Sequence, residues 1–279
     1  MRLDLMRRRA TVPARINIIG EHTDYSGGLS LPFAANYQLI LEANKRISGF
    51  TGDDTVIELW KAAGGWPADI IVNSSIPIGK GLSSSAALCV AVVLCSQGNQ
   101  DILTVAKEAQ RIEHQVLGTP CGLLDQLAVL NAKKGHASLI DFSDLSIKLV
   151  PIPNNWIFKL VDSNIKRDLS MTDYGMDNNV LENHVIDENS RVIDAIGSSP
   201  KELGELLEKS HSSLINLGVS LPEIDQQIES LKMIDGVLGA RMMGGGFGGM
   251  ILVLIDDLEV LPQYPIISSS GPAFLEEIL

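Results

Sequence analysis

Hydrophobic and polar residues alternate in several short stretches of the first half of the chain. Two of these stretches, 37–42 and 55–60, show the two-residue period of half-buried strands, and residues 69–73 add a third. The third stretch leads into a loop rich in Gly and Ser at residues 77–85. Residues 86–94, which follow, are apolar on every side and predict a buried central helix.

Longer periods dominate further along the chain. Residues 101–117 carry an apolar stripe at helical spacing that ends at Gly118 and Pro120. The later elements that the pattern predicts are a short helix at 123–131, strands at 137–142 and 156–162, helices at 180–196, 201–217 and 222–234, and strands at 237–243 and 250–255. This order predicts an α+β fold of mixed or antiparallel sheets with helices, in two lobes of residues 1–150 and 151–279.

The composition narrows the class of protein. Of the 279 residues, 45% are hydrophobic and 20% are charged, as in ordinary soluble globular proteins. The net charge of −12 opposes binding to nucleic acid or to an anionic membrane. The longest apolar run, residues 86–95, is about half of a membrane-spanning helix, and the 3 cysteines form no CxxC pair. We therefore expect a cytoplasmic protein that binds no nucleic acid and no membrane.

The loop before the apolar helix has the sequence PIGKGLSSSAA. Its small residues place free backbone N–H groups at the positive end of a helix dipole, where a phosphate group binds well. A plain helix cap would need only one Ser, so three in a row after Gly79-Lys80-Gly81 favour a phosphate site. The loop is not a Walker A motif, because Gly rather than Ser or Thr follows Lys80.

Two further segments are unusually rich in polar residues or in Gly. Residues 13–32 carry carboxylates and an imidazole beside isoleucines, which predicts a loop held against the core and directed at a polar ligand. A polyol would suit this loop, because Asp and Glu accept hydrogen bonds from neighbouring hydroxyls. Residues 244–249, GGGFGG, match the dinucleotide fingerprint literally, but a strand follows rather than a helix. A tight hairpin and a backbone contact with a ligand explain that segment equally well.

Two acids flank the turn at residues 118–120. Asp125 falls in the first turn of the short helix, where a carboxylate also simply complements the helix dipole. Glu113 lies near the end of the preceding helix, so the turn could bring the two acids together. Two acids and a serine-rich phosphate loop are the parts of a magnesium–nucleotide site. The residues alone therefore predict a protein that binds a phosphorylated ligand and a hydroxylated one.

Taken together, these segments resemble the motifs of the galactokinases in the GHMP sugar-kinase family. RINIIGEHTDYSGG with LPFA resembles the sugar-binding motif, PIGKGLSSSAA the phosphate loop, PCGLLDQ the catalytic-acid motif and GARMMGGGFGG the third motif. These motifs occur in the same order as in the family. Weaker likeness in the segments between them extends the resemblance over nearly the whole chain. The resemblance implies a two-lobed GHMP-kinase-like fold with its active site in the cleft between the lobes. It also implies transfer of phosphate from ATP, with Mg²⁺, to the anomeric C1 hydroxyl of galactose.

The resemblance also implies roles for single residues. Asp125 would take the proton of the C1 hydroxyl or stabilise its alkoxide, and Arg15 beside it would keep it ionised. The residues implied to hold the sugar are Glu21, His22, Asp24, Gly122 and Tyr174. The residues implied to hold the nucleotide are Gly79, Lys80, Gly81, Leu82, Ser83, Ser84 and Ser85, with Gly245 and Gly246 closing over the site. Ser85 and Glu113 match the Mg²⁺ ligands.

The chain departs from the family pattern in ways that leave alternatives open. Ala14, Met243 and Met250 stand where Gly, Thr and Cys are usual, and the chain is several dozen residues shorter after Tyr174. That region would face C2 and C6 of the sugar, so a kinase for N-acetylgalactosamine, galacturonate or arabinose is an alternative. A non-catalytic galactose and ATP sensor is another, against which the intact Arg15 and Asp125 argue. Two tryptophans, Trp60 and Trp66, are candidates for stacking on adenine, although ordinary packing explains them more simply.

Overall fold

The computed structural model describes residues 6–165 and 177–278, and three antiparallel sheets organise them. The four-stranded sheet has the order β10 (Phe274–Ile278), β1 (Arg7–Asn17), β3 (Pro32–Lys45), β4 (Ala68–Ser74). The second sheet has the order β2 (Leu29–Ser30), β5 (His136–Asp141), β6 (Ser146–Pro151). The third has the order β7 (Ile157–Asp162), β9 (Met250–Ile255), β8 (Val237–Met242). Every pairing between named strands is antiparallel, which agrees with the predicted α+β fold of mixed or antiparallel sheets.

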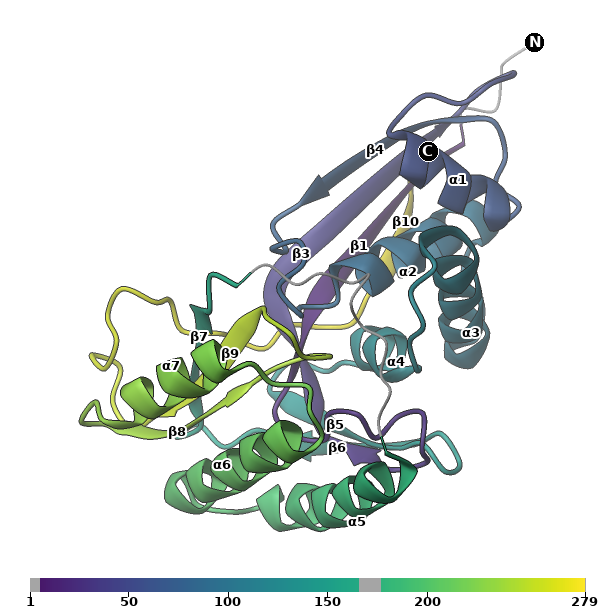
Figure 1. The fold of residues 1–279 in the computed structure, drawn as a ribbon. Coiled ribbons are helices and arrows are strands. Elements are labelled where there is room, and N and C mark those ends of the chain that lie inside the picture. Colours follow the sequence, from purple (N-terminus) through teal and green to yellow (C-terminus); the bar gives the residue numbers. More distant parts are fainter. Residues whose placement is uncertain (1–5, 166–176, 279) are drawn as a thin grey trace.

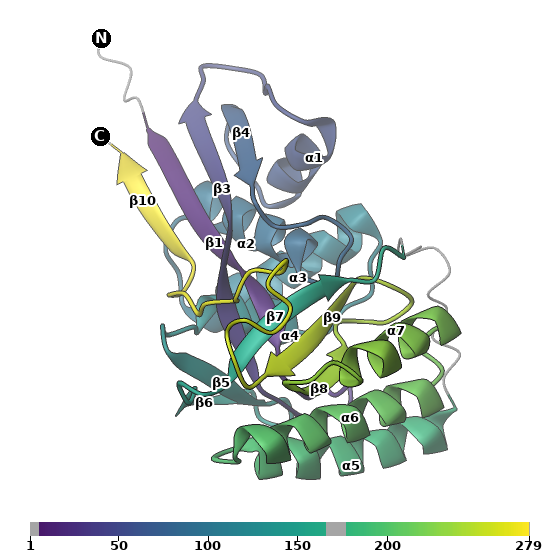
Figure 2. The same ribbon diagram turned by 90° about the vertical axis from the view of Figure 1, so that its left-hand side faces the viewer.

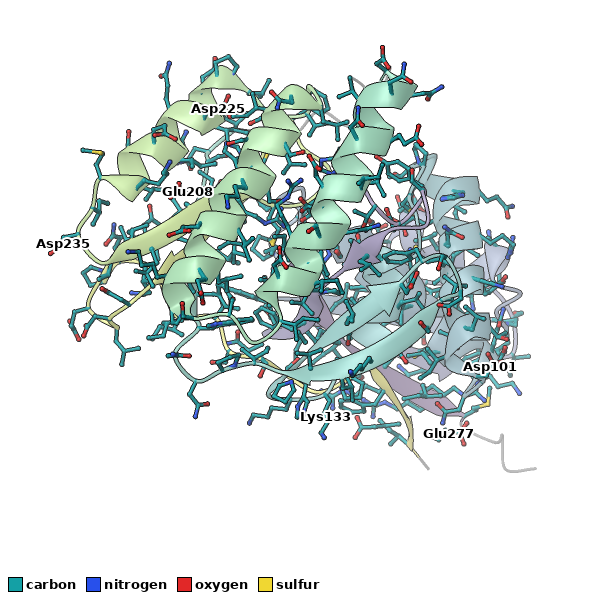
Figure 3. The ribbon with its side chains drawn as sticks, turned by 90° about the horizontal axis from the view of Figure 1, so that it is seen from below. Asp101, Lys133, Glu208, Asp225, Asp235 and Glu277 are labelled. Carbon is teal, nitrogen blue, oxygen red and sulfur yellow. The ribbon has the colours of Figure 1, made fainter. Side chains whose placement is uncertain are left out.

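Two groups of helices accompany these sheets (Figure 1). The first group lies beside the four-stranded sheet and consists of α1 (Asp54–Ala62), α2 (Ser84–Gln97), α3 (Ile102–Ile112) with the π-helical turn η1 (Glu113–Leu117), and α4 (Leu124–Leu130). The second group consists of α5 (Asn178–Ala195), α6 (Pro200–Asn216) and α7 (Pro222–Lys232). Seen from below, α5, α6 and α7 lie side by side, with acidic residues such as Glu208 on α6 and Asp225 on α7 (Figure 3). α6 and α7 pack on β8 of the third sheet, whereas α5 packs on α6 and on β2 of the second sheet.

Helix α2 is the central element of the first group (Figure 2). The sequence predicted a buried helix at 86–94, and the structure confirms it, because ten residues of α2 from Ala86 to Ser96 are buried. It packs on β1 and β3 on one side and on α3 and α4 on the other. An all-apolar helix is stable only in such surroundings. The packing fixes the amino end of α2. It thereby also fixes the loop of residues 77–85 that leads into this helix, which we call the serine loop.

The prediction of a strand at 55–60 is wrong, because these residues form α1. The Asp53 side chain caps this helix by accepting from the backbone N–H groups of Thr55 and Val56. The residues that the helix buries, Val56, Leu59 and Trp60, are spaced three and one apart and so share one helical face. In a stretch this short the same residues also produce a two-residue alternation, and the cap decides between the two.

The segment of residues 13–32 is only partly the loop that the sequence predicted. Strand β1 runs through it as far as Asn17, with β10 and β3 as its neighbours. A register shift between Pro13 and Ala14 marks a bulge, and Arg15 follows directly after it. Arg15 therefore stands on a buried strand, which holds its side chain more firmly than a loop would. Strands β6 and β10 were also missed by the sequence analysis.

The residues of the two predicted lobes contact each other in more than one place. Strand β10, from the carboxyl end, pairs with β1 in the four-stranded sheet and brings Ile278 opposite Arg7 (Figure 1). One hydrophobic cluster includes residues of both groups of helices, from Ala87 in α2 to Leu203 in α6. The division at residue 150 remains a prediction. Within the described residues no single helix has the length and apolarity to span a membrane; α2 together with residues 102–117 does so only as a pair bent by 116°.

Candidate active site

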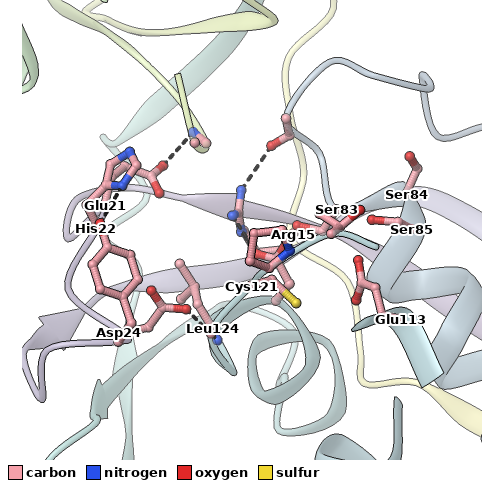
Figure 4. Close-up of a pocket in the computed structure, with 18 of the residues that line it drawn as sticks. Arg15, Glu21, His22, Asp24, Ser83, Ser84, Ser85, Glu113, Cys121 and Leu124 are labelled. Carbon is pink, nitrogen blue, oxygen red and sulfur yellow. Dashed lines mark hydrogen bonds and ion pairs between the residues drawn. The ribbon is translucent and has the colours of Figure 1, made fainter. Parts of the chain in front are cut away.

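A cavity of about 280 Å³ gathers the segments that the sequence analysis singled out (Figure 4). Its walls come from residues 15–25, 78–85, 113–125 and 244–245. These segments belong to β1 and the loop after it, the serine loop, the region between α3 and α4, and the turn between β8 and β9. All four motifs therefore meet in one place.

Arg15 and Asp125 form the closest charged pair of the cavity. Arg15 Nε donates to Asp125 Oδ1 at 2.8 Å, and Nη2 of Arg15 lies 2.5 Å from the same oxygen. The Arg15 side chain is 5% exposed and that of Asp125 26%. Burial would lower the pKa of Arg15, but the negative charges of Asp125 and Glu21 outweigh it and raise the pKa. Arg15 is therefore a permanent cation, and Nη1 also donates to Gly81 O of the serine loop at 3.0 Å.

The serine loop has unused hydrogen-bonding capacity at the start of α2. Ser83 occupies the N-cap position, yet its side chain caps nothing, and its buried Oγ has no hydrogen-bond partner among the described residues. Its φ of 61° is left-handed, which a residue with a Cβ adopts only under constraint. Ordinary capping therefore does not explain this serine. The N–H groups of the first turn and this hydroxyl are available to an anion at the positive helix end.

Glu113 lies on the same wall as the serine loop. Burial raises the pKa of Glu113 to about 7; the Ser85 hydroxyl lowers it, and the Asp125 charge raises it further. Gln126 Nε2 donates to Glu113 Oε2 at 2.9 Å and fixes one side of the carboxylate. The turn at 118–120 thus brings Glu113 and Asp125 together as expected. Within the described part of the chain, no group of three or more His, Cys, Asp or Glu residues forms a metal site on its own.

Glu21 lies on the opposite side of the cavity and is held by charge. Its Oε1 accepts from the Gly244 N–H at 2.8 Å and from Arg241 Nη2 at 2.9 Å. Burial would raise the pKa of Glu21, but the positive charges of Arg15 and Arg241 and the Gly244 hydrogen bond lower it to about 2. Glu21 is therefore an anion at neutral pH.

Asp24 and Gly122 lie in direct contact. Asp24 Oδ2 accepts from the Leu124 N–H at 3.3 Å, and a Cβ added to Gly122 would lie 1.9 Å from the same oxygen. Residue 122 must therefore be Gly if the carboxylate is to lie here. Burial raises the pKa of Asp24 to about 6; the Leu124 hydrogen bond lowers it, and the nearby charge of Asp125 raises it further.

His22 completes this side of the cavity. The residue is buried and left-handed, with φ 57°, and its Nδ1 lies 2.8 Å from the Tyr25 hydroxyl. The two rings meet edge to face with centroids 6.0 Å apart. Tyr25 lines the cavity as well and is half exposed. The cavity therefore has one side rich in groups that bind hydroxyls and another side rich in groups that bind phosphate.

Three family descriptions match the chain in the same order as its motifs. They are the galactokinase galactose-binding signature at residues 7–45, the GHMP kinases N terminal domain at 50–133 and the GHMP kinases C terminal domain at 192–263. The galactokinase of Thermotoga maritima is 33% identical over 310 aligned positions, which cover 88% of this chain and 89% of the relative. This chain belongs to the galactokinase family. The galactokinase of Thermotoga neapolitana also shows 33% identity over the same extent.

Solved structures show the same fold. The galactokinase of Lactococcus lactis, complexed with galactose, superimposes with a TM-score of 0.82 at 23% identity and covers 96% of this chain and 95% of its own. The mevalonate kinase of Methanococcus jannaschii superimposes with a TM-score of 0.73 at 16% identity, covering 97% and 100% of the two chains. The expected GHMP-kinase fold is therefore confirmed. Since the alignment to the Thermotoga maritima enzyme is longer than the 279 residues of this chain, it includes gaps on this side, as in a compact member of the family.

The structure brings together most of the residues expected at the site. Those that line the cavity are Arg15, Glu21, His22, Asp24, Gly79, Gly81, Ser83, Ser84, Ser85, Glu113, Gly122, Asp125 and Gly245. Tyr174 lies outside the described residues. Three others do not line the cavity. The Lys80 side chain pairs with Asp162 at 2.7 Å, Leu82 is buried in the core, and a Cβ on Gly246 would lie 2.3 Å from Val219 O.

Some residues of the site escaped the sequence analysis. Arg241 was quoted within a motif but given no role, although one arginine in the otherwise uncharged stretch of β8 signals a buried partner. Tyr25, Cys121 and Gly244 also line the cavity. Trp60, a candidate for stacking on adenine, is fully buried, and its Nε1 donates to Trp66 O at 2.7 Å. Trp60 is therefore a core residue.

Proposed function

We propose that this protein transfers the γ-phosphate of ATP to the anomeric C1 hydroxyl of galactose, giving galactose 1-phosphate and ADP. The observation that carries the proposal is that the Arg15–Asp125 pair and the serine loop line one cavity. Membership of the galactokinase family supports galactose as the acceptor. The Arg15–Asp125 ion pair also favours an enzyme over a non-catalytic sensor, because a sensor has no need of it.

Asp125 is the group proposed to accept the proton of the C1 hydroxyl. As the sugar oxygen bonds to the γ-phosphorus, the bond from that phosphorus to the β–γ bridging oxygen breaks and ADP leaves with its electrons. The proton moves to a carboxylate oxygen of Asp125. Arg15 fixes the orientation of this carboxylate through two contacts with Oδ1, and its charge offsets the charge that develops on the transferred group. Most of the rate then comes from positioning and electrostatics.

The sugar is proposed to bind between Glu21, His22, Asp24 and Gly122, and Tyr174 remains a further candidate. Carboxylate oxygens accept hydrogen bonds from vicinal hydroxyls, and an imidazole donates or accepts. Gly122 contributes the space that the Asp24 carboxylate occupies. This side of the cavity therefore suits a neutral sugar with several free hydroxyls. Galacturonate would bring a further negative charge close to Glu21 and Asp24, which disfavours it relative to galactose.

The nucleotide is proposed to bind at the serine loop. Backbone N–H groups of residues 79–85 and the free Ser83 hydroxyl would hold the phosphates, with the turn at Gly245 facing them. In this reading Lys80 and Leu82 contribute main-chain groups only, and Gly246 shapes the turn. The proposed partners are the sugar and Mg-ATP alone, and the proposed compartment is the cytoplasm.

The Ser85 hydroxyl and the Glu113 carboxylate are the groups proposed to hold Mg²⁺. Both are oxygen donors, and Mg²⁺ commonly takes one or two carboxylates together with substrate phosphates. The oxygen donor set present therefore fits this ion. When bound, the ion would neutralise charge on the β- and γ-phosphates. Gln126 would keep the Glu113 carboxylate in place through its hydrogen bond to Oε2.

The experiment that tests this proposal removes the acceptor of the proton. With Mg-ATP, the purified protein should release ADP only when galactose is added. Asp125→Asn should lower kcat by roughly 100- to 10,000-fold, the usual worth of a general base, while nucleotide affinity in calorimetry stays within about twofold. Asp144→Asn, in the exposed turn between β5 and β6, is the matched control and should keep full activity. Unchanged kcat in Asp125→Asn would refute the assignment, and a panel with N-acetylgalactosamine and arabinose would rank the acceptors.

A further inference from the structure

One oxygen of Glu21 serves two parts of the site at once. Oε1 accepts from the Gly244 N–H and from Arg241 Nη2, at 2.8 and 2.9 Å. Glu21 lines the side of the cavity proposed for the sugar, whereas Gly244 belongs to the turn between β8 and β9. Any movement of this carboxylate therefore changes a hydrogen bond to the glycine-rich turn (Figure 4).

Arg241 holds the Glu21 carboxylate and the backbone near the end of β1 in place. Its side chain is fully buried on β8, and its planar guanidinium makes bonds in several directions. Nε donates to Ile18 O and Nη2 to Asn17 O, both at 2.9 Å. We call residues 18–28, between β1 and β2, the sugar-side loop. The Arg241 side chain thus holds both the backbone at the start of this loop and the Glu21 carboxylate within it. It touches neither the proposed sugar nor the proposed nucleotide, since it is absent from the cavity walls.

The glycine-rich turn between β8 and β9 also packs against the serine loop. A Cβ on Gly81 would lie 2.9 Å from Met243 O, and one on Gly244 would lie 3.1 Å from Gly81 Cα. Met250 N also donates to Lys80 O at 3.0 Å. Glu21, Gly244 and Gly81 therefore form a continuous path of direct contacts from the hydroxyl-binding side of the cavity to the phosphate-binding side.

We propose that Arg241 is a positioning residue that couples binding of the sugar to binding of the nucleotide through Glu21 and Gly244. This inference rests on the proposed function, which supplies both ligands. A sugar hydroxyl that donates to Glu21 holds the carboxylate where Gly244 and Arg241 meet it, so the turn is ordered against the serine loop before the nucleotide arrives. The coupling is reciprocal, so the nucleotide raises the affinity for the sugar by the same factor.

Calorimetry with a non-hydrolysable ATP analogue, Mg-AMP-PNP, tests this coupling. In the wild-type protein, saturating galactose should lower the Kd of the analogue by about fivefold or more, the lower end of typical coupling factors. Arg241→Lys keeps a cation but loses the planar fork, and should reduce the factor to near one. A factor in Arg241→Lys equal to that of the wild type would overturn the proposal.

Lys159→Met is the matched control. Lys159 is also a buried cation of the third sheet, but its Nζ donates to the carbonyls of Leu258, Val260 and Leu261, away from the cavity. This variant loses a buried cation without touching Glu21, so the coupling factor should stay at its wild-type value. A loss of coupling in Lys159→Met as large as in Arg241→Lys would show a general effect of destabilisation and overturn the proposal.

Hydrogen exchange of the wild-type protein keeps the inference testable if Arg241→Lys does not fold. Galactose alone should slow exchange in a peptide covering residues 241–249 and leave one covering 256–261 unchanged. Equal exchange with and without galactose would overturn the coupling. Binding of both ligands with a wild-type factor of one would refute this inference alone, whereas failure of either ligand to bind would refute the proposed function too.

Discussion

Gly122 leaves no room for a larger side chain in the proposed sugar pocket. A methyl group there would meet the Asp24 carboxylate at 1.9 Å, a distance that forces one of them to move. We expect Gly122→Ala to raise the KM for galactose at least tenfold, since a displaced carboxylate loses its hydrogen bonds to the sugar, with nucleotide affinity unchanged. Steady-state kinetics measures this.

The control for that substitution is Gly271→Ala. No atom lies within 4 Å of a Cβ added to Gly271, and its φ is outside the left-handed region, so the enzyme should keep its KM. If Gly122→Ala also kept a wild-type KM for galactose, the contact between Asp24 and the sugar would have to be abandoned.

Asp24 gives the site a dependence on pH. Burial raises the pKa of Asp24 from 3.8 to about 6. Between pH 3.8 and pH 6 the folded protein therefore keeps a proton on Asp24 that the unfolded chain has already released. Stability contributed by this group therefore falls as pH rises from 3.8 to 6. The affinity for galactose should change in the other direction with pH. As the pH is lowered below 6, the affinity should decrease by up to about tenfold per pH unit, because protonated Asp24 is a poorer hydrogen-bond acceptor.

The measurement is the Kd of galactose from pH 5 to 8, in the wild type and in Asp24→Asn. The asparagine does not titrate, so its Kd should be higher at pH 8 and nearly constant across the range. Identical pH profiles for the two proteins would mean that another group controls the binding of the sugar.

Among the elements, α1 is capped by a single side chain. Asp53 accepts from the backbone N–H groups of Thr55 and Val56 and so satisfies two donors at the start of the helix. We expect Asp53→Ala to lower the free energy of unfolding by about 1 kcal/mol, as measured in urea. Asp54→Ala, one residue later in the first turn, loses only an interaction with the helix dipole and should cost less than half as much. Equal losses would contradict the capping role.

The elements differ in how well the sequence predicts them, for physical reasons. Helix α2 was found because its apolar residues allow only a buried position. α1 was mistaken for a strand because nine residues are too few to separate the two periods, and the deciding hydrogen bonds come from the preceding residue. Strand β10 has mostly exposed side chains, so pairing of its backbone with β1 leaves no apolar pattern to read.

The residues of the candidate site also differ in how well the sequence predicts their positions. Motif residues that contribute a charge or a small side chain, such as Arg15, Asp125 and Gly122, line one cavity, and their assigned roles remain predictions. The Lys80 side chain was not, because its partner Asp162 comes from β7, which no local pattern connects to the serine loop. Arg241 likewise meets Ile18 and Glu21 only because β8 packs against the segment that follows β1, which no local pattern shows.

In the whole molecule, a single cavity joins parts of the chain that are far apart in sequence. β1 supplies Arg15, the start of α4 supplies Asp125, and the turn between β8 and β9 supplies Gly244. Arg241 of β8 donates to Ile18 O just after β1, and Asp162 of β7 pairs with Lys80 of the serine loop, so the third sheet also shapes the site. Because the net charge is −12, binding of the proposed triphosphate would depend on local features, namely the dipole of α2, Arg15 and the Mg²⁺ ion proposed at Ser85 and Glu113.

The most direct test of this account identifies the product by nuclear magnetic resonance. After incubation of the protein with galactose and Mg-ATP, the account predicts a new phosphomonoester signal in the ³¹P spectrum that is coupled to the anomeric proton of galactose, with an equal amount of ADP. Asp125→Asn should form both products at least about 100-fold more slowly. A phosphorylated product whose phosphorus couples to another position of the sugar, or ADP formed without any sugar phosphate, would contradict it.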